Sequence, residues 1–123
     1  MKKFLPVFLI MTLISCVSHE EKGIEVVIKN NTDKMLTNVG FSTTEKLEVL
    51  AMGDIQADER VSDFLSMKNN IVDGAYSLTF THSDGKKETS ITGYYTNGAP
   101  LEKRVEYRIE NDSTFVTFSK FGY

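Results

Sequence analysis

The chain has 123 residues, of which 41% are hydrophobic and 25% are charged, and it carries a formal net charge of −3 at pH 7. This length suits one domain with a real hydrophobic core, and the acidic balance excludes attraction to nucleic acid or anionic lipid through net charge. With one cysteine in the whole sequence, the chain cannot form an internal disulfide, so the core alone must stabilise it.

The first part of the chain has the layout of an export signal. Lys2 and Lys3 form a positive head, residues 4–14 form a short and largely apolar run, and the small residue Ser15 precedes Cys16. This arrangement is typical of a secretory signal peptide that is removed from the mature protein. The apolar run is shorter than the roughly 20 residues that a membrane-spanning helix needs. We therefore predict a cleaved signal peptide, helical in the precursor, and no permanent transmembrane anchor.

The residues at the cleavage point, Leu13-Ile14-Ser15-Cys16, resemble the lipobox of bacterial lipoproteins. The resemblance implies cleavage between Ser15 and Cys16, a diacylglyceryl group on the Cys16 sulfur and acylation of the new amine. Each buried methylene of an acyl chain contributes about 0.8 kcal/mol, so two or three chains hold a small domain firmly at a membrane. The alternative is an ordinary signal peptide that leaves Cys16 as a free thiol.

The residues after the cysteine bear on location. Val17 stands where an inner-membrane retention signal would place Asp, which favours the outer membrane. Glu20 and Glu21 resemble the acidic export signal of surface lipoproteins, although such residues are also ordinary in a solvated tether. We expect a lipid-anchored protein of the outer membrane, on either its periplasmic or its cell-surface face.

Beyond this tether, apolar and polar residues alternate in short runs, the pattern of strands with one buried face. Turn clusters such as residues 30–34 and Ser83-Asp84-Gly85 separate the runs. In the run 47–52 both faces are apolar, which predicts a central strand. The strands predicted on this basis cover residues 24–29, 36–42, 47–52, 76–81, 87–95, 104–109 and 114–121.

One segment, Ile55 to Met67, fits two structures. Ala57, Val61 and Leu65 have helical spacing. An edge strand over residues 61–67 fits the strand-rich neighbours equally well, and we favour the strand.

Seven or eight short strands with turns between them predict an all-β, antiparallel β-sandwich. In size and pattern this part resembles the small immunoglobulin-like or transthyretin-like modules found behind lipoboxes. The Cys–Trp–Cys core of a true immunoglobulin domain is missing, because the chain has no tryptophan. The expected organisation is a signal peptide (1–15), a lipidated cysteine with a flexible tether (16–23) and a β-sandwich domain (24–123).

Groups able to catalyse a reaction or bind a metal are few. His82-Ser83-Asp84 contains the residue types of a hydrolase triad, but neighbours in a tight hairpin cannot converge as nucleophile, base and orienting group. His19 and His82 are the only histidines, and the acidic residues within 54–63 lack the spacing of a calcium loop. We predict a non-enzymatic protein without metal or cofactor.

The candidate binding surface is the end of the predicted strand 87–95. Alternation places Thr89, Ile91, Gly93 and Tyr95 on one side, so Tyr94 points outward if Tyr95 points to the core.

Next along the chain, Thr96 and Asn97 precede Gly98, and Pro100 cannot donate to a sheet. An exposed Tyr94 beside such a loop is a common contact surface for an envelope protein or a glycan. The alternative is that Tyr94 packs under a neighbouring loop.

A modification signal lies near the C-terminus. Asp112-Ser113-Thr114 resembles a short bacterial O-glycosylation motif, with Ser113 as acceptor in a predicted exposed turn. Taken together, these features predict a lipid-anchored, non-enzymatic binding or assembly module. The alternative is a lipoprotein inhibitor or immunity protein that neutralises a toxin, lysozyme or protease through residues 96–100.

Overall fold

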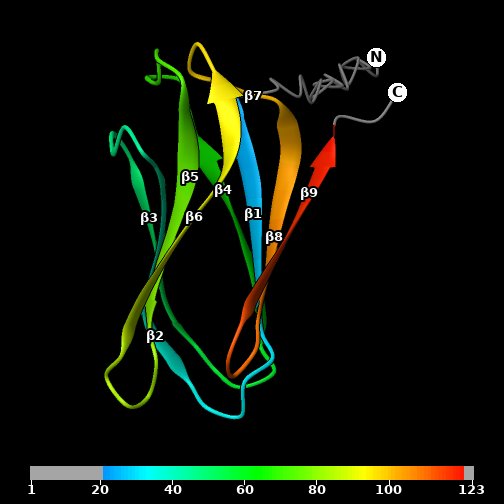
Figure 1. Ribbon diagram of the computed structural model, residues 1–123. Coiled ribbons are helices and arrows are strands. Elements are labelled where there is room, and N and C mark those ends of the chain that lie inside the picture. The colour runs from blue at the N-terminus through cyan, green and yellow to red at the C-terminus, as the bar shows by residue number, and fades with distance from the viewer. Residues whose placement is uncertain (1–20, 121–123) are drawn as a thin grey trace, which may run out of the picture.

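The computed structural model describes residues 21–120, and these residues form strands joined by turns (Figure 1). The predicted all-β fold is therefore confirmed; the expected signal-peptide helix lies outside the described residues. The strands are β1 (Gly23–Asn30), β2 (Leu36–Thr43), β3 (Val49–Ile55), β4 (Arg60–Ser66), β5 (Gly74–Thr81), β6 (Lys87–Thr96), β7 (Ala99–Pro100), β8 (Glu102–Ile109) and β9 (Thr114–Lys120). Over residues 21–120 we find no helix with the length and apolarity needed to cross a membrane.

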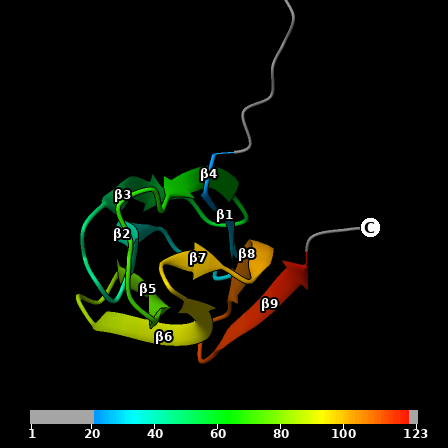
Figure 2. The ribbon, with the colours of Figure 1, turned by 90° about the horizontal axis from the view of Figure 1, so that it is seen from above.

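The strands form two sheets that pack face to face (Figures 1 and 2). One sheet has the order β4-β1-β8-β9 and the other has the order β3-β2-β5-β6-β7. The first two strands of the chain thus lie in different sheets. The constant-type immunoglobulin domain places its first two strands in the same sheet, so the strand order here differs from that type.

One strand pair departs from the antiparallel pairing expected throughout. β1 and β8 run parallel, with Val26 opposite Val105 and Ile28 opposite Tyr107. The other pairs are antiparallel. A parallel pair needs a long crossover connection, and here the connection contains all the intervening strands. Local alternation of residues carries no information about such a distant pairing.

The core lies between the two sheets and is built largely from the positions that alternation predicts. Aromatic rings fill the space between the layers: Phe41 stacks on Tyr76 of the same sheet with centroids 5.9 Å apart, and it meets Tyr107 of the other sheet edge-on at 6.0 Å. Burial raises the pKa of Tyr107 to about 12. The core residues of β1, β2, β5 and β8 are Ile24, Val26, Ile28, Leu36, Val39, Phe41, Tyr76, Leu78, Phe80, Val105, Tyr107 and Ile109.

β3 and β4 each lie at the edge of a sheet. The prediction of a central strand over residues 47–52 is wrong, because Val49 and Ala51 face solvent while Leu50 and Met52 pack partly against the core. The ambiguous segment 55–67 contains β4, which confirms the favoured edge strand.

A bulge in β6 separates the residues that simple alternation places together. Gly93 has a φ of 78°, and the register shifts so that Thr92 faces Tyr76 while Tyr95 faces Gly74. Such an insertion turns the following side chains over. Tyr95 is therefore fully buried although Ile91 is 62% exposed, and the prediction that they share a side is wrong. Tyr94 does point outward, as predicted.

The C-terminal end of β1 is held to the opposite sheet by one buried side chain. The Asn30 amide nitrogen donates to the carbonyl oxygens of Lys34, Ile55 and Gln56 at 2.9–3.1 Å, and its oxygen accepts two hydrogen bonds from Thr32. Asn30 is fully buried. These bonds satisfy backbone groups that would otherwise be shielded from water without a partner.

We expect Asn30→Ala to lower the free energy of unfolding by about 2–4 kcal/mol, because it leaves several buried polar groups without a hydrogen-bond partner. Urea denaturation measures this loss. The matched control is Asn31→Ala, since the Asn31 amide makes one partly exposed bond to Glu110 at 3.3 Å, and we expect a loss below about 1 kcal/mol. Equal losses in the two variants would contradict the assigned role of Asn30.

Candidate functional site

The sequence-predicted site residues lie at opposite ends of the sandwich (Figure 1). Cys16 and Ser15 lie outside the described residues. We call the end where β1 begins the near end, and it carries residues 44–48, 67–73 and 97–101. We call the other end the far end, and its turns are residues 31–35, 56–59, 82–86 and 110–113.

At the near end, Tyr94 and Asn97 share one acceptor. The Tyr94 hydroxyl donates to Asp73 Oδ2 at 3.1 Å, and the Asn97 backbone N–H donates to Asp73 Oδ1 at 2.8 Å. Tyr94 is 50% exposed, but its polar tip is already engaged. The hydrogen bond from the Tyr94 hydroxyl to this carboxylate raises the tyrosine's pKa.

The turn between β6 and β7 is fixed against the loop of residues 67–73. Thr96 pairs with Ala99 across the turn, and Gly98 donates its N–H to the Val72 carbonyl oxygen at 2.8 Å. A side chain at Gly98 would collide with the backbone carbonyl of Asn70. Only glycine allows this approach, so the loop is a rigid hairpin and not the sheet break expected around Pro100.

A second carboxylate joins the remaining near-end turn to the same loop. The Tyr95 hydroxyl donates to Glu45 Oε1 at 2.8 Å, and the Ile71 N–H donates to Glu45 Oε2 at 3.3 Å. Burial acts to raise the pKa of the Glu45 carboxyl, but hydrogen bonds from Tyr95, Asn70 and the backbone of Ile71 and Val72 outweigh it and lower the pKa. The partners are distant in sequence, which is why no motif revealed the network.

We expect Asp73→Ala to return the pKa of Tyr94 toward the ordinary tyrosine value of about 10, because the carboxylate that stabilises the protonated phenol is gone. Ultraviolet titration of the tyrosines measures the change. Asp84→Ala, at the far end, is the control and should leave the titration curve unaltered. An unchanged curve in Asp73→Ala would mean that the bond between Tyr94 and Asp73 does not form in solution.

The far end contains an open groove of about 510 Å³ between three turns that are remote in sequence. Its centre is polar: His82 Nε2 lies 3.1 Å from Glu88 Oε1, and Lys86 Nζ lies 3.6 Å from the same oxygen. The imidazole also packs edge-on against Phe80, with centroids 5.2 Å apart. The groove is lined by Thr32, Asp33, Lys34, Met35, Leu36, His82, Ser83, Asp84, Lys86, Glu88, Asn111 and Asp112.

The hairpin at residues 82–86 has the turn geometry expected from its sequence and no triad. The His82 N–H donates to the Lys86 carbonyl at 2.8 Å, and Asp84 Oδ1 accepts from the Lys86 N–H at 2.9 Å. The His82 ring pairs with Glu88 instead of Asp84. Within residues 21–120, no three His, Cys, Asp or Glu side chains gather in a way that could hold a metal ion.

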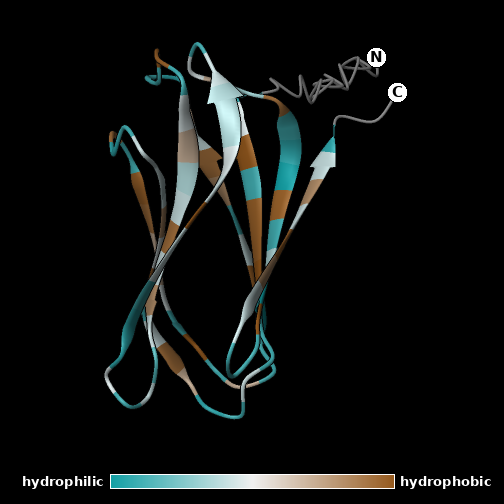
Figure 3. Ribbon diagram, in the orientation of Figure 1, coloured by the Kyte–Doolittle hydropathy of each residue, from teal (hydrophilic) through white to brown (hydrophobic). Residues whose placement is uncertain are grey.

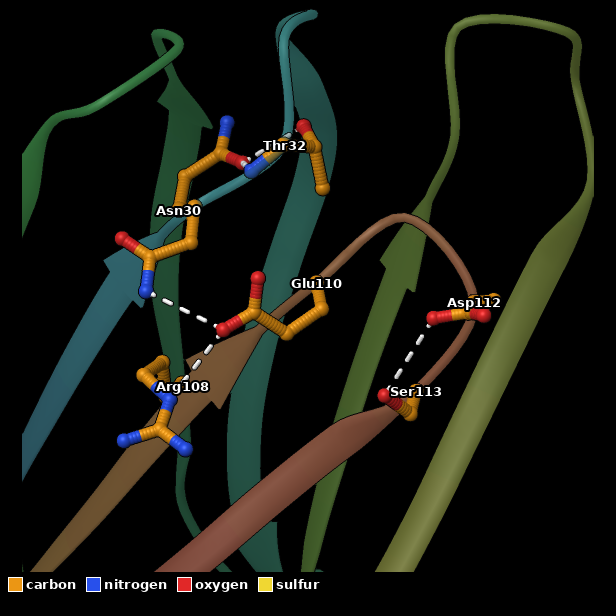
Figure 4. Close-up of polar contacts among 7 residues, drawn as sticks. Asn30, Thr32, Arg108, Glu110, Asp112 and Ser113 are labelled. Carbon is orange, nitrogen blue, oxygen red and sulfur yellow. Dashed lines mark hydrogen bonds and ion pairs between the residues drawn. The ribbon is translucent and has the colours of Figure 1, made fainter.

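Ser113 lies in the far-end turn between β8 and β9, where Figure 4 shows it beside Asp112. Its hydroxyl donates to Asp112 Oδ1 at 3.4 Å, and both residues are exposed. The predicted exposed turn is confirmed; O-glycosylation of Ser113 stays a prediction.

Comparison with known proteins adds information about the fold. No protein-family model and no curated protein matches the chain. The NMR structure of a protein from Eubacterium rectale is similar, with a TM-score of 0.55 and 13% sequence identity over 81% of this chain and 91% of that one. At this identity, the similarity shows a shared β fold and nothing about function.

Proposed function

We propose that this protein is a lipid-anchored outer-membrane lipoprotein whose β-sandwich binds an envelope partner without catalysing a reaction. The observation that supports the anchor is the lipobox-like sequence ending at Cys16, seven residues before β1 begins at Gly23. A lipid on Cys16 would join the membrane to the near end through a short segment of chain. The far end would then face away from the membrane.

The groove at the far end is the better candidate for the partner site. Its Lys86, Asp84 and Asp112 side chains lie on turns that a partner approaching from outside the membrane would meet first. Mixed charges and hydrogen-bonding groups of this kind fit a polar partner, a protein surface or a glycan.

The surface predicted around Tyr94 is less suited to an external partner. The Tyr94 O–H and the Asn97 N–H both donate to Asp73, so neither donor is free for a ligand. The rigid 96–100 hairpin suits an inhibitor or immunity protein, because a pre-organised loop binds at a low entropic cost. However, the hairpin lies at the near end, beside the proposed anchor, where an external partner would reach it less easily. The far-end groove is therefore the favoured partner site.

The lipid anchor is tested by Cys16→Ser. We expect the variant to remain an uncut precursor or to leave the membrane fraction, because the acyl chains that hold the domain are absent. Fractionation and mass spectrometry of the full chain measure both results, with Ser18→Ala as the control that stays processed and membrane-bound. A correctly processed Cys16→Ser protein that still sediments with membranes would refute the anchor.

The partner site is tested by substituting two adjacent lysines, Lys86 and Lys87. Lys86 lines the groove, whereas Lys87 begins β6 and lies outside it. We expect Lys86→Glu to weaken capture of the partner from detergent-solubilised membranes about tenfold, the value of one lost charge-assisted contact. Lys87→Glu makes the same charge change and should leave capture intact. Equal effects would show that net charge, and not the groove, governs binding.

A further inference from the structure

Large hydrophobic side chains are exposed at the near end and scarce at the far-end turns. Ile71 and Val72, in the loop between β4 and β5, are 75% and 52% exposed, and the tip of this loop is brown in Figure 3. Leu47 and Leu101 in neighbouring turns are also exposed. Among large hydrophobic residues of the described far-end turns, only Met35 is exposed, at 36%. Apolar side chains gathered at one end indicate an interaction surface.

The near-end turns present these side chains from a preformed platform. The Ile71 N–H is bound to Glu45 of the β2–β3 turn, and the Val72 carbonyl is bound to Gly98 of the β6–β7 turn. The loop that carries the two apolar residues is therefore tied to both of its neighbours. Little conformational entropy is lost when such a surface meets a partner.

The charges around the apolar residues suit lipid headgroups. Exposed lysines flank them, namely Lys46, Lys68 and Lys103, and the half-buried Glu48 and Glu102 lie near them in the chain. Long lysine side chains keep their ammonium groups at headgroup level while apolar neighbours enter the boundary with the acyl chains. The carboxylates of Glu45 and Asp73 are occupied by hydrogen bonds from within the near end.

A lipid on Cys16 would bring this end close to a membrane. The Lys22 carbonyl accepts from the Met67 N–H at 2.8 Å, and Lys22 Nζ donates to the Asn70 carbonyl at 3.1 Å, beside Ile71. Cys16 precedes Lys22 by six residues, a separation of at most about 20 Å even if extended. A lipid on Cys16 would hold the near end at a high effective concentration relative to the bilayer.

We infer that the near end seats on the bilayer surface, with Ile71, Val72 and Leu101 in the boundary between headgroups and acyl chains. This inference rests on the proposed lipid on Cys16 and adds a second, non-covalent contact to it. The contact fixes the orientation of the domain and directs the far-end groove away from the membrane.

The chain has no tryptophan, so a single introduced indole reports its own surroundings. Ile71→Trp places it at the near end, and Phe115→Trp, at an exposed aromatic position near the far end, is the matched control. The lipidated full chain is placed in vesicles of phosphatidylethanolamine and phosphatidylglycerol, with and without brominated acyl chains. We expect blue-shifted emission and loss of emission to bromine for Ile71→Trp and water-like emission for Phe115→Trp. If Ile71→Trp does not fold, Leu101→Trp tests the same contact.

The outcomes separate this inference from the proposed anchor. Water-like emission from Ile71→Trp in a protein whose lipid on Cys16 is verified by mass spectrometry overturns the membrane contact alone. A blue shift without quenching by bromine means that a protein surface covers the loop, which also overturns it. A mass without lipid on Cys16 refutes the anchor, and the inference falls with it.

Discussion

The parallel pairing of β1 with β8 is the constraint on which the rest of the molecule depends. It joins the first described strand to a strand from the last quarter of the described chain, with antiparallel neighbours on both sides. At the far end, the pairing brings the turn after β1 against the turn after β8, where the Asn31 N–H donates to the Ile109 carbonyl at 2.8 Å. That junction forms one wall of the groove. At the near end, it fixes the point from which the chain leads back toward Cys16.

Different polar side chains hold the turns at the two ends of the sandwich. At the near end, Asp73 and Glu45 accept hydrogen bonds from neighbouring turns, so these carboxylates stabilise the loops and leave apolar tips exposed. At the far end, the buried Asn30 side chain stabilises the turns through hydrogen bonds to backbone carbonyls such as that of Ile55. Lys86 and Asp84, on the far-end turn of residues 82–86, are exposed. A protein built in this way is suited to contact apolar and polar surroundings at opposite ends.

A domain without a disulfide must obtain its stability from packing. Here aromatic rings pack within one sheet, where Phe41 stacks on Tyr76, and between the layers, where Phe41 meets Tyr107. Offset and edge-on pairs contribute about 0.5–1.5 kcal/mol each beyond the area they bury. Tyr107 is fully buried, and this burial raises the pKa of its phenol.

The sequence by itself determined the strands and most of their inward faces, because a period of two residues fixes which side chains point the same way. It also predicted the hairpin at Ser83-Asp84-Gly85 and the outward direction of Tyr94. Tertiary structure alone decided that β3 is an edge strand, that β1 and β8 are parallel, and that Gly93 turns Tyr95 inward. It also decided where the groove lies. These features depend on contacts between residues far apart in the chain, and alternation within one segment cannot encode them.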